Sequence, residues 1–333
     1  MIYDLSSCPY SNRHGLYGGR GGDKDGIVFQ GANWIVKYPK TTKGMSVPDD
    51  LKYTTSPLSE YIGSHIYQIL GFDTHETILG YRNHKIVVAL KDFLSDSERL
   101  AEIRTVKNAA NKDLADDLKV ELPSSETGDL VDLDVLFLHM DHNSVLSSVP
   151  GVKERFWEMV VVDALIDNND RNNGNWGIIL GEDRRLAPIY DNGNSFNNKT
   201  SESQIIKYLE ESNEQIVTRA VGGRTSFVYN GKTMSVKRML SLGVPELNSA
   251  IVRLTPVIRK MLPDIYQMID DIPENYHGLT VIEPVRKYYY KLVLDIRHSH
   301  LLEPLYQSLV VKQELARKEQ QSRNKSQQMD IEM

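Results

Sequence analysis

Two short polar segments carry the side chains that could do chemistry in this chain. The first holds Asp170 and, five residues later, Asn175; the second is Tyr190-Asp191-Asn192-Gly193. Phosphoryl transfer needs a carboxylate that orients the acceptor hydroxyl, and it needs oxygen ligands that hold Mg²⁺ against the nucleotide phosphates. We therefore interpret Asp170 as the base, and Asn175 and Asp191 as the magnesium ligands.

The elements around these segments are predicted to hold them in place. Apolar residues at helical spacing predict a helix over 152–166, and apolar runs predict strands over 176–180 and 186–190. A polar loop between a core helix and a buried strand cannot be buried without partners, which is typical of a site. The alternatives are a solvated asparagine-rich turn at 167–175 and an ordinary turn at 191–193.

A second group of residues could hold nucleotide phosphates. Backbone N–H groups of a glycine-rich loop can approach anionic oxygens closely, although many such loops are only flexible. The loop consists of Gly18, Gly19, Arg20, Gly21 and Gly22. Downstream, Lys37 lies in an apolar strand and Glu60 in the first turn of a helix, an order that suits a lysine–glutamate pair at the phosphates. Lys37 could instead point outward, and Glu60 could simply favour the positive end of its helix.

The pattern changes character near residue 95, from strands to long helices. The predicted elements are a hairpin over 27–38, a polar loop over 40–56, a helix from Ser56 to Gly71, strands over 77–81 and 85–90, helices over 152–166, 247–261 and 285–298, and a hairpin over 226–234. We therefore predict an α+β fold with a small β-rich lobe (1–95), a mainly helical lobe (96–315) and a disordered polar tail (316–333).

Composition limits the class of protein. The 333 residues are 40% hydrophobic and 25% charged, which is ordinary for a globular protein, and the net charge of −6 argues against direct nucleic-acid binding. Cys8 is the only cysteine, so no intrachain disulfide can form and a reducing cytoplasm is expected. No apolar run is long enough for membrane insertion, the first residues do not read as a secretory signal, and the histidines form no tight zinc cluster.

Together these residues resemble the HipA-like atypical serine/threonine kinases of bacteria, and among them the shorter members of the CtkA type. The resemblance covers roughly residues 15–200 and rests on Lys37, Glu60, Asp170, Asn175 and Asp191-x-Gly. The loop around Asp170 and the Asp191 segment are also similar to those of the type II phosphatidylinositol 4-kinases.

The resemblance implies a bilobal protein-kinase-like fold, ATP with Mg²⁺, and phosphorylation of a protein on serine or threonine, including autophosphorylation. It implies that Asp170 is catalytic, that Asn175 and Asp191 bind magnesium, and that Lys37 contacts the α- and β-phosphates. The connector Lys91-Asp92-Phe93 would lie near the adenine. Some family members have an antitoxin partner. Because the glycine loop begins by residue 18, the extra N-terminal subdomain of full-length HipA proteins is not expected, so an antitoxin-like partner stays open.

The chain departs from the family pattern in two places. The second residue after the catalytic aspartate is Asn172, so we expect the positive charge that faces the γ-phosphate to come from Arg171 or Arg20. The glycine loop has no serine or threonine, so the inhibitory autophosphorylation of the family is not expected there. Substitute sites in the following loop are Thr41, Thr42, Ser46, Thr54, Thr55 and Ser56.

These observations favour a serine/threonine protein kinase over two alternatives. One is a phosphoinositide kinase, which the Asn175-Trp176 and Asp191-Asn192-Gly193 details favour but the absence of a cysteine cluster or a basic membrane face opposes. The other is a catalytically inactive nucleotide-binding interaction module. Because every expected type of site residue is present, this third interpretation ranks last.

Overall fold

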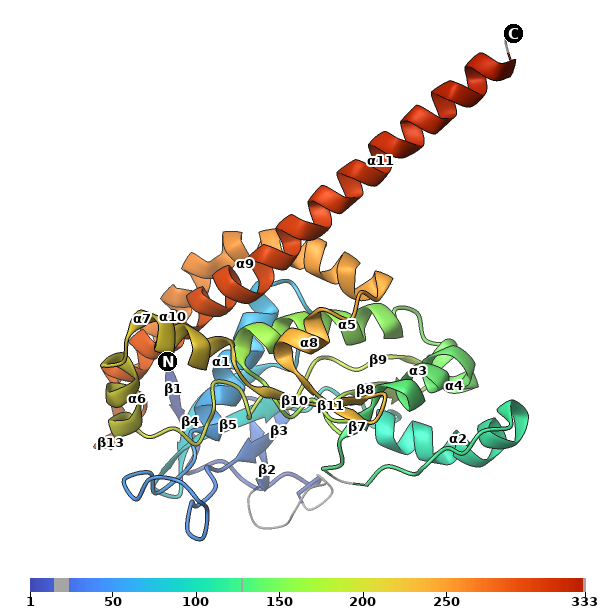
Figure 1. The fold of residues 1–333 in the computed structure, drawn as a ribbon. Coiled ribbons are helices and arrows are strands. Elements are labelled where there is room, and N and C mark those ends of the chain that lie inside the picture. The colour runs from blue at the N-terminus through green and yellow to red at the C-terminus, as the bar shows by residue number, and fades with distance from the viewer. Residues whose placement is uncertain (15–23, 127, 332–333) are drawn as a thin grey trace.

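The fold is described from a computed structural model that covers residues 1–14, 24–126 and 128–331. Figure 1 shows a sheet-rich N-terminal part, a mainly helical C-terminal part and one long helix that projects from the body. The predicted glycine loop, Gly18 to Gly22, lies outside the described residues. None of the helices within them is long and apolar enough to cross a membrane.

The N-terminal part is built on a five-stranded sheet in the order β1-β4-β5-β3-β2. Its strands are β1 (Ile2–Asp4), β2 (Lys24–Phe29), β3 (Ala32–Lys37), β4 (Thr77–Arg82) and β5 (Lys85–Lys91). β1 runs parallel to β4, and the other neighbours are antiparallel. The β2–β3 turn is made by Gln30 and Gly31, both at positive φ, which matches the twist of a tight hairpin. The sequence pattern favours a turn at residues 31–33 of the predicted hairpin. The observed turn lies at residues 30–31 instead, and Ala32 already belongs to β3.

Helix α1 (Ser56–Ile69) packs on β4 and β5 and begins at the last residue of the predicted loop over 40–56. Pro57 lies in its first turn, where a missing N–H costs nothing. The sequence favours Ser56 as the N-cap because Pro57 follows it, but Thr55 occupies that position and makes no side-chain capping bond. The helix buries Leu58, Ile62 and Ile66, as their helical spacing predicts.

The C-terminal part contains helices and three small sheets. The helices are α2 (Ile103–Leu118), α3 (Leu133–His142), α4 (Ser144–Ser147), α5 (Val152–Ile166), α6 (Glu202–Leu209), α7 (Asn213–Val221), α8 (Val236–Leu240), α9 (Pro245–Asp270), α10 (Pro284–Arg297), the π-helix η1 (His298–Leu302) and α11 (Glu303–Ile331). The sheets pair β6 (Arg99–Glu102) with β8 (Gly177–Leu180) and β9 (Arg185–Leu186), β7 (Val131–Asp132) with β10 (Arg224–Tyr229) and β11 (Lys232–Ser235), and β12 (Asn275–Tyr276) with β13 (Leu279–Thr280).

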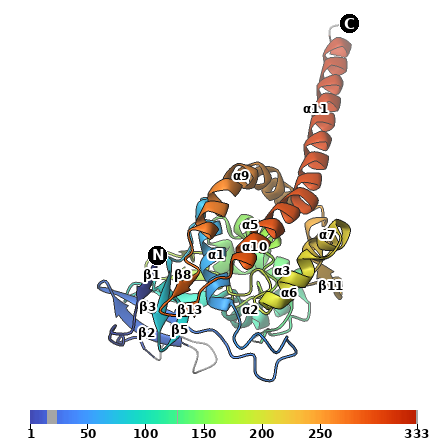
Figure 2. The same cartoon turned by 90° about the vertical axis from the view of Figure 1, so that its left-hand side faces the viewer.

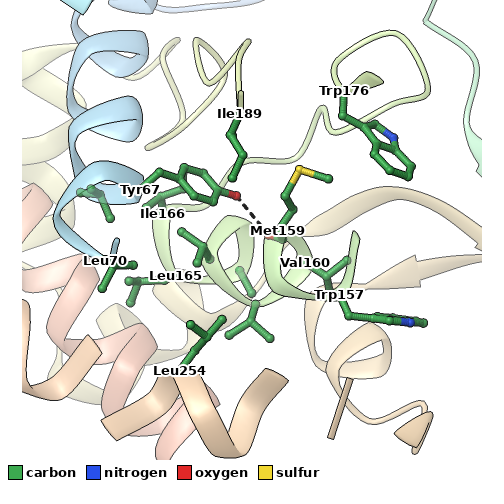
Figure 3. Packing of buried hydrophobic residues seen from close by; sticks show 14 of the residues in the cluster. Tyr67, Leu70, Trp157, Met159, Val160, Leu165, Ile166, Trp176, Ile189 and Leu254 are labelled. Carbon is green, nitrogen blue, oxygen red and sulfur yellow. Dashed lines mark hydrogen bonds between the residues drawn. The ribbon is translucent and has the colours of Figure 1, made fainter. Parts of the chain in front are cut away.

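One large hydrophobic core joins α1 to the C-terminal helices. Figure 3 shows Tyr67 of α1 beside Met159 and Leu165 of α5. The hydroxyl of Tyr67 donates to the Met159 carbonyl at 3.2 Å and to Asp163 Oδ1 at 2.8 Å. A second, small core lies within the sheet, around Trp34. Helix α1 is therefore fastened to the part of the molecule that contains α5 and the loop after it.

The predicted strand over 186–190 is largely irregular. Only its first residue lies in β9, and Pro188 cannot donate a ladder hydrogen bond. Ile189 instead forms an isolated parallel bridge with Thr74, in the connection between α1 and β4. This bridge fixes the chain just before Asp191.

The polar tail differs from its predicted disorder. Residues 316–331 continue α11, which projects away from the body in both views (Figures 1 and 2). Side chains 311–321 are exposed, so packing does not hold residues 316–321 helical. The reason lies in composition, because alanine, glutamate, glutamine, lysine and arginine are strong helix formers and the segment has no glycine or proline.

Candidate active site

Lys37, Glu60 and Asp191 meet at one point between the N-terminal sheet, α1 and the segment after β9. The ammonium of Lys37 donates to Glu60 Oε2 at 2.9 Å and to Asp191 Oδ1 at 2.8 Å. Glu60 is 1% exposed, whereas the Asp191 side chain is 43% exposed, so the cluster is buried on one side and open on the other. The alternative in which Lys37 points outward does not apply to this arrangement.

The opposite charges within the cluster favour the ionised form of each group. Burial by itself raises the pKa of Glu60, but Lys37 and His75 outweigh it, so the pKa of Glu60 lies well below its usual range. The protein around Asp191 likewise raises its pKa, and Lys37 more than reverses that effect. Burial lowers the pKa of Lys37, yet the two carboxylates together raise it above its ordinary value. All three groups are therefore ionised near neutral pH.

Two glycines allow residues 190–193, the predicted metal-binding segment, to approach α1 closely. A Cβ at Gly193 would lie 3.1 Å from Glu60 Oε2, and one at Gly63 would lie 2.9 Å from Asn192 Cβ. The backbone N–H of Asn192 donates to Glu60 Oε1 at 2.8 Å. The glutamate thus holds the lysine with one oxygen and the segment after Asp191 with the other.

Arg171 joins the loop over 167–175, the predicted catalytic loop, to the metal-binding segment. Its guanidinium is 1% exposed and binds Asp163 Oδ2 through Nε at 2.8 Å. It also donates to the Tyr190 carbonyl at 2.6 Å and to Asn192 Oδ1 at 2.6 Å. The prediction that Arg171 faces the γ-phosphate is therefore wrong, because its donors are buried in this network. The other candidate, Arg20, lies outside the described residues.

Asp170 stands on the exposed side of this loop. Asn172 donates to Asp170 Oδ1 at 3.1 Å, and the amide group of Asn175 donates to the Asp170 carbonyl. Surrounding protein desolvates Asp170 and raises its pKa, while the hydrogen bond from Asn172 opposes the rise. A carboxylate of raised pKa that still contacts solvent is suited to accept a proton from an acceptor hydroxyl.

The side chains at the metal positions fit magnesium in their chemistry. Asp191 engages Lys37 through Oδ1, and its second carboxylate oxygen is a hard donor. The amide nitrogen of Asn175 faces the Asp170 carbonyl, which leaves the amide oxygen on the other side. Two hard oxygens, completed by water and phosphate oxygens, would form the kind of partial coordination shell that Mg²⁺ uses.

The predicted adenine connector has its backbone at the end of β5, but its side chains have separate partners. Lys91 is 45% exposed and pairs with Glu76 at 2.8 Å. Asp92 accepts from Arg13 Nη1 at 2.7 Å, and the ring of Phe93 lies 6.2 Å from that of Tyr190. Among these contacts, that of Phe93 is the one with a residue of the metal-binding segment, Tyr190.

Sequence reasoning missed Lys24. It is the first residue of β2 and lies directly opposite Lys37 in the β2–β3 register. Burial lowers the pKa of Lys24, and the charge of Lys37 lowers it further, while Asp191 and Glu60 oppose this. Two features of the sequence could have revealed Lys24. It follows closely after the glycine loop, and a tight turn at residues 30–31 places it opposite Lys37.

A sheet-rich lobe and a helical lobe that meet at a lysine–glutamate–aspartate cluster are the features of the bilobal protein-kinase-like fold, as predicted. No family model matches the chain. A curated relative, the serine/threonine-protein kinase CtkA of Helicobacter pylori, is 30% identical over 219 residues, which cover 64% of this chain and 62% of the relative.

Solved structures agree on the fold. The crystal structure of the H. pylori proinflammatory kinase CtkA matches with a TM-score of 0.76 and 24% identity, over 93% of this chain and 99% of that one. HipA from the HipA–HipB–operator DNA complex of Shewanella oneidensis MR-1 matches with a TM-score of 0.50 and 13% identity, over 88% of this chain and 68% of that one. The predicted resemblance to the HipA-like kinases of the CtkA type is confirmed.

Proposed function

We propose that this protein is an ATP- and Mg²⁺-dependent serine/threonine protein kinase of the HipA-like type. The observation that carries the proposal is the Lys37 ammonium held between Glu60 and Asp191, next to a loop that presents Asp170. Similarity to a curated serine/threonine-protein kinase supports the same reaction class.

Each residue has a distinct role in this proposal. Lys37 binds the α- and β-phosphate oxygens while Glu60 keeps its ammonium in place. Asp191 and Asn175 hold the magnesium ion, and Asp170 orients the acceptor hydroxyl and takes its proton. Bound ATP supplies the phosphoryl group, and magnesium neutralises charge on the phosphates. The glycine loop over 18–22 covers the phosphates, and the backbone of Lys91-Asp92-Phe93 borders the adenine.

The proposal also covers the phosphoryl acceptor, the cellular compartment and the partner protein. A protein hydroxyl is the proposed acceptor, in another protein and in the kinase itself, within a reducing cytoplasm. Of the sites suggested for autophosphorylation, Thr41 and Ser46 are exposed, whereas Thr42 and Thr54 are buried. Self-modification is therefore proposed at Thr41 or Ser46. An antitoxin-like protein is a candidate partner by analogy with the relatives of the HipA type.

The purified protein incubated with γ-labelled ATP and Mg²⁺ tests this proposal, alone, with cell extract and with phosphoinositide vesicles. Label on serine or threonine of a protein is expected and should require Mg²⁺. Label confined to lipid would replace the proposal with the phosphoinositide kinase. Nucleotide binding with no transfer to any acceptor would leave the inactive binding module.

A further inference from the structure

A buried polar cluster surrounds Oε1 of Glu60, the carboxylate oxygen that Lys37 does not bind, and the proposed reaction gives the other members of this cluster no role. It joins Glu60 and Ser64, one turn apart on α1, to His75 from the α1–β4 connection and to Asn192 from the metal-binding segment. These residues are 1%, 1%, 5% and 0% exposed, respectively. A carboxylate, a hydroxyl, an imidazole and an amide buried together must satisfy one another's hydrogen bonds.

The imidazole of His75 stands at the centre of this cluster. Its Nε2 lies 2.9 Å from Ser64 Oγ and 3.3 Å from Glu60 Oε1. Ser64 Oγ also accepts from Asn192 Nδ2 at 3.0 Å, and the Asn192 N–H donates to Glu60 Oε1 at 2.8 Å. These four contacts close a ring that links α1, the α1–β4 connection and the segment after Asp191.

The geometry identifies which nitrogen of His75 carries the proton. A lone pair on Nε2 would face the ionised carboxylate of Glu60, which is repulsive in a buried site. A proton on Nε2 instead points at Ser64 Oγ and Glu60 Oε1, and both oxygens can accept it. His75 is therefore a hydrogen-bond donor toward the glutamate.

The backbone around His75 is fixed to the same segment. The N–H of His75 donates to the Ile189 carbonyl at 3.1 Å, and the N–H of Ile189 donates to the Asp73 carbonyl at 2.9 Å. The Thr74 hydroxyl donates to the Ile189 carbonyl at 3.0 Å. Because Ile189 lies two residues before Asp191, residues 73–75 fix the chain at the start of the metal-binding segment.

Glu60 needs these donors when a nucleotide is bound. Lys37 shares its ammonium between two carboxylates, and phosphate oxygens would draw it outward. A buried carboxylate left with fewer donors is costly, so Glu60 would follow the lysine or take up a proton. The Nε2–H of His75 and the N–H of Asn192 supply the remaining partners and keep Glu60 ionised and in place.

We propose that His75 and Ser64 are positioning residues that lock α1 to the metal-binding segment, so that the Lys37–Glu60–Asp191 cluster is assembled before substrate binds. Neither touches the reacting atoms; both act through Glu60 and Asn192. The inference rests on the proposed kinase function for its kinetic consequences. Its geometric content, an Nε2-protonated His75 bound to Ser64 and Glu60, does not depend on that function.

Three substitutions at His75 separate its roles. The amide nitrogen of His75→Gln can occupy the position of Nε2, whereas that of His75→Asn is one carbon short and falls near Nδ1; His75→Leu keeps the bulk without a donor. We expect Leu and Asn to raise the KM for ATP and lower kcat/KM by roughly 10- to 100-fold, the range for residues that orient site ligands. His75→Gln should restore most of the loss, and Ser64→Ala should have a smaller effect of the same kind.

Controls and a second measurement make the test decisive. His65→Gln removes a histidine of α1 itself that bonds the Tyr61 carbonyl rather than the site, and it should leave KM unchanged. Thermal unfolding of each variant reports folding separately. Wild-type kinetics in folded His75→Leu, or equal losses in Gln, Asn and Leu, would overturn the proposal.

Nitrogen-15 NMR of histidine-labelled protein tests the geometry without any reaction. The His75 resonances, assigned by their loss in His75→Gln, should show a proton on Nε2. A proton on Nδ1 alone would refute the inference even in an active kinase. If wild-type protein transfers no phosphate but shows the Nε2 proton, the proposed function fails and the buried lock stands.

Discussion

At the scale of residues, Lys37 binds two carboxylates that differ in their exposure to solvent. Glu60 is enclosed and has other donors, while Asp191 is partly open. In the proposed function, this difference would let Lys37 turn from Asp191 to the phosphates while Glu60 keeps its other hydrogen bonds. Burial raises the pKa of Asp170, the hydrogen bond from Asn172 opposes the rise, and the charge of Asp191 adds to it.

The hydrogen bond from Asn172 predicts a change in pH dependence. It favours the ionised form of Asp170, so Asn172→Ala should raise the pKa of Asp170 further. A base of higher pKa is protonated at higher pH, so the acidic limb of kcat/KM should move to higher pH, with little change at alkaline pH. A pH profile of kcat/KM at fixed Mg²⁺ measures this; an unmoved or lowered acidic limb would show that Asp170 is not the base.

Lys24 predicts a second phosphate contact. Cross-strand partners lie on the same face of a sheet, so Lys24 and Lys37 form a pair of like charges that a phosphate anion relieves. Lys24→Ala should weaken ATP binding by about tenfold, the scale of one charge-assisted hydrogen bond, and should spare adenosine. Lys153→Ala is the matched control, because its ammonium pairs with Asp141 and has no assigned role in the site. Equal affinities in calorimetric titrations of the two variants would exclude a role for Lys24.

At the scale of elements, the site depends on how closely α1 approaches the metal-binding segment. Gly63 and Gly193 permit this approach, and Arg171 holds the segment from the other side. Helix α1 also joins the main core through Tyr67, so the helix that carries Glu60 is rigidly attached to α5. The catalytic loop follows α5 directly.

Gly63→Ala tests this close approach. An added Cβ would lie 2.9 Å from Asn192 Cβ, so the helix or the segment must move. Overpacking of this kind costs about 1–3 kcal/mol, more than alanine's helical preference returns. We expect a lower free energy of unfolding in urea and weaker Mg²⁺-dependent ATP binding. Gln68→Ala, at an exposed position of the same helix, should change neither; loss of stability without loss of binding would mean that the contact only supports folding.

The sequence predicted the main elements well because each is marked locally. Helix 152–166 has apolar residues on every turn and matches α5 at both ends. The partners of Arg171 were not predictable, because Asp163, Tyr190 and Asn192 come together only through tertiary packing. The same holds for His75, which carries no local motif. Short strands such as β1 and β7 carry too few residues to show a period.

At the scale of the whole molecule, the lobes share a core instead of meeting across a simple hinge. The sheet has its own small cluster, while α1 belongs to the large one. A second contact comes from the β12–β13 hairpin, where the ring of His277 stacks on Tyr81 of β4 at 4.9 Å. Motion of the sheet against the helices is therefore constrained at two places.

The projecting end of α11 is expected to be dispensable. Side chains 311–321 are exposed, so the described part of this end contributes little to either core. Removing residues 316–333 should leave the thermal midpoint unchanged and the rate of phosphoryl transfer within about twofold of the full chain, since surface changes away from packed features cost little. A large loss of activity with an unchanged midpoint would instead assign this helix a role in binding the acceptor.

Single-turnover transfer by Asp170→Asn, measured beside ATP binding, tests the central claim most directly. The variant keeps the shape of the side chain but cannot take a proton. We predict that it binds ATP with Mg²⁺ as tightly as the wild type, while transfer to a protein hydroxyl falls by roughly a thousandfold. Transfer at the wild-type rate by the variant, or none by the wild type with any acceptor, would contradict the account.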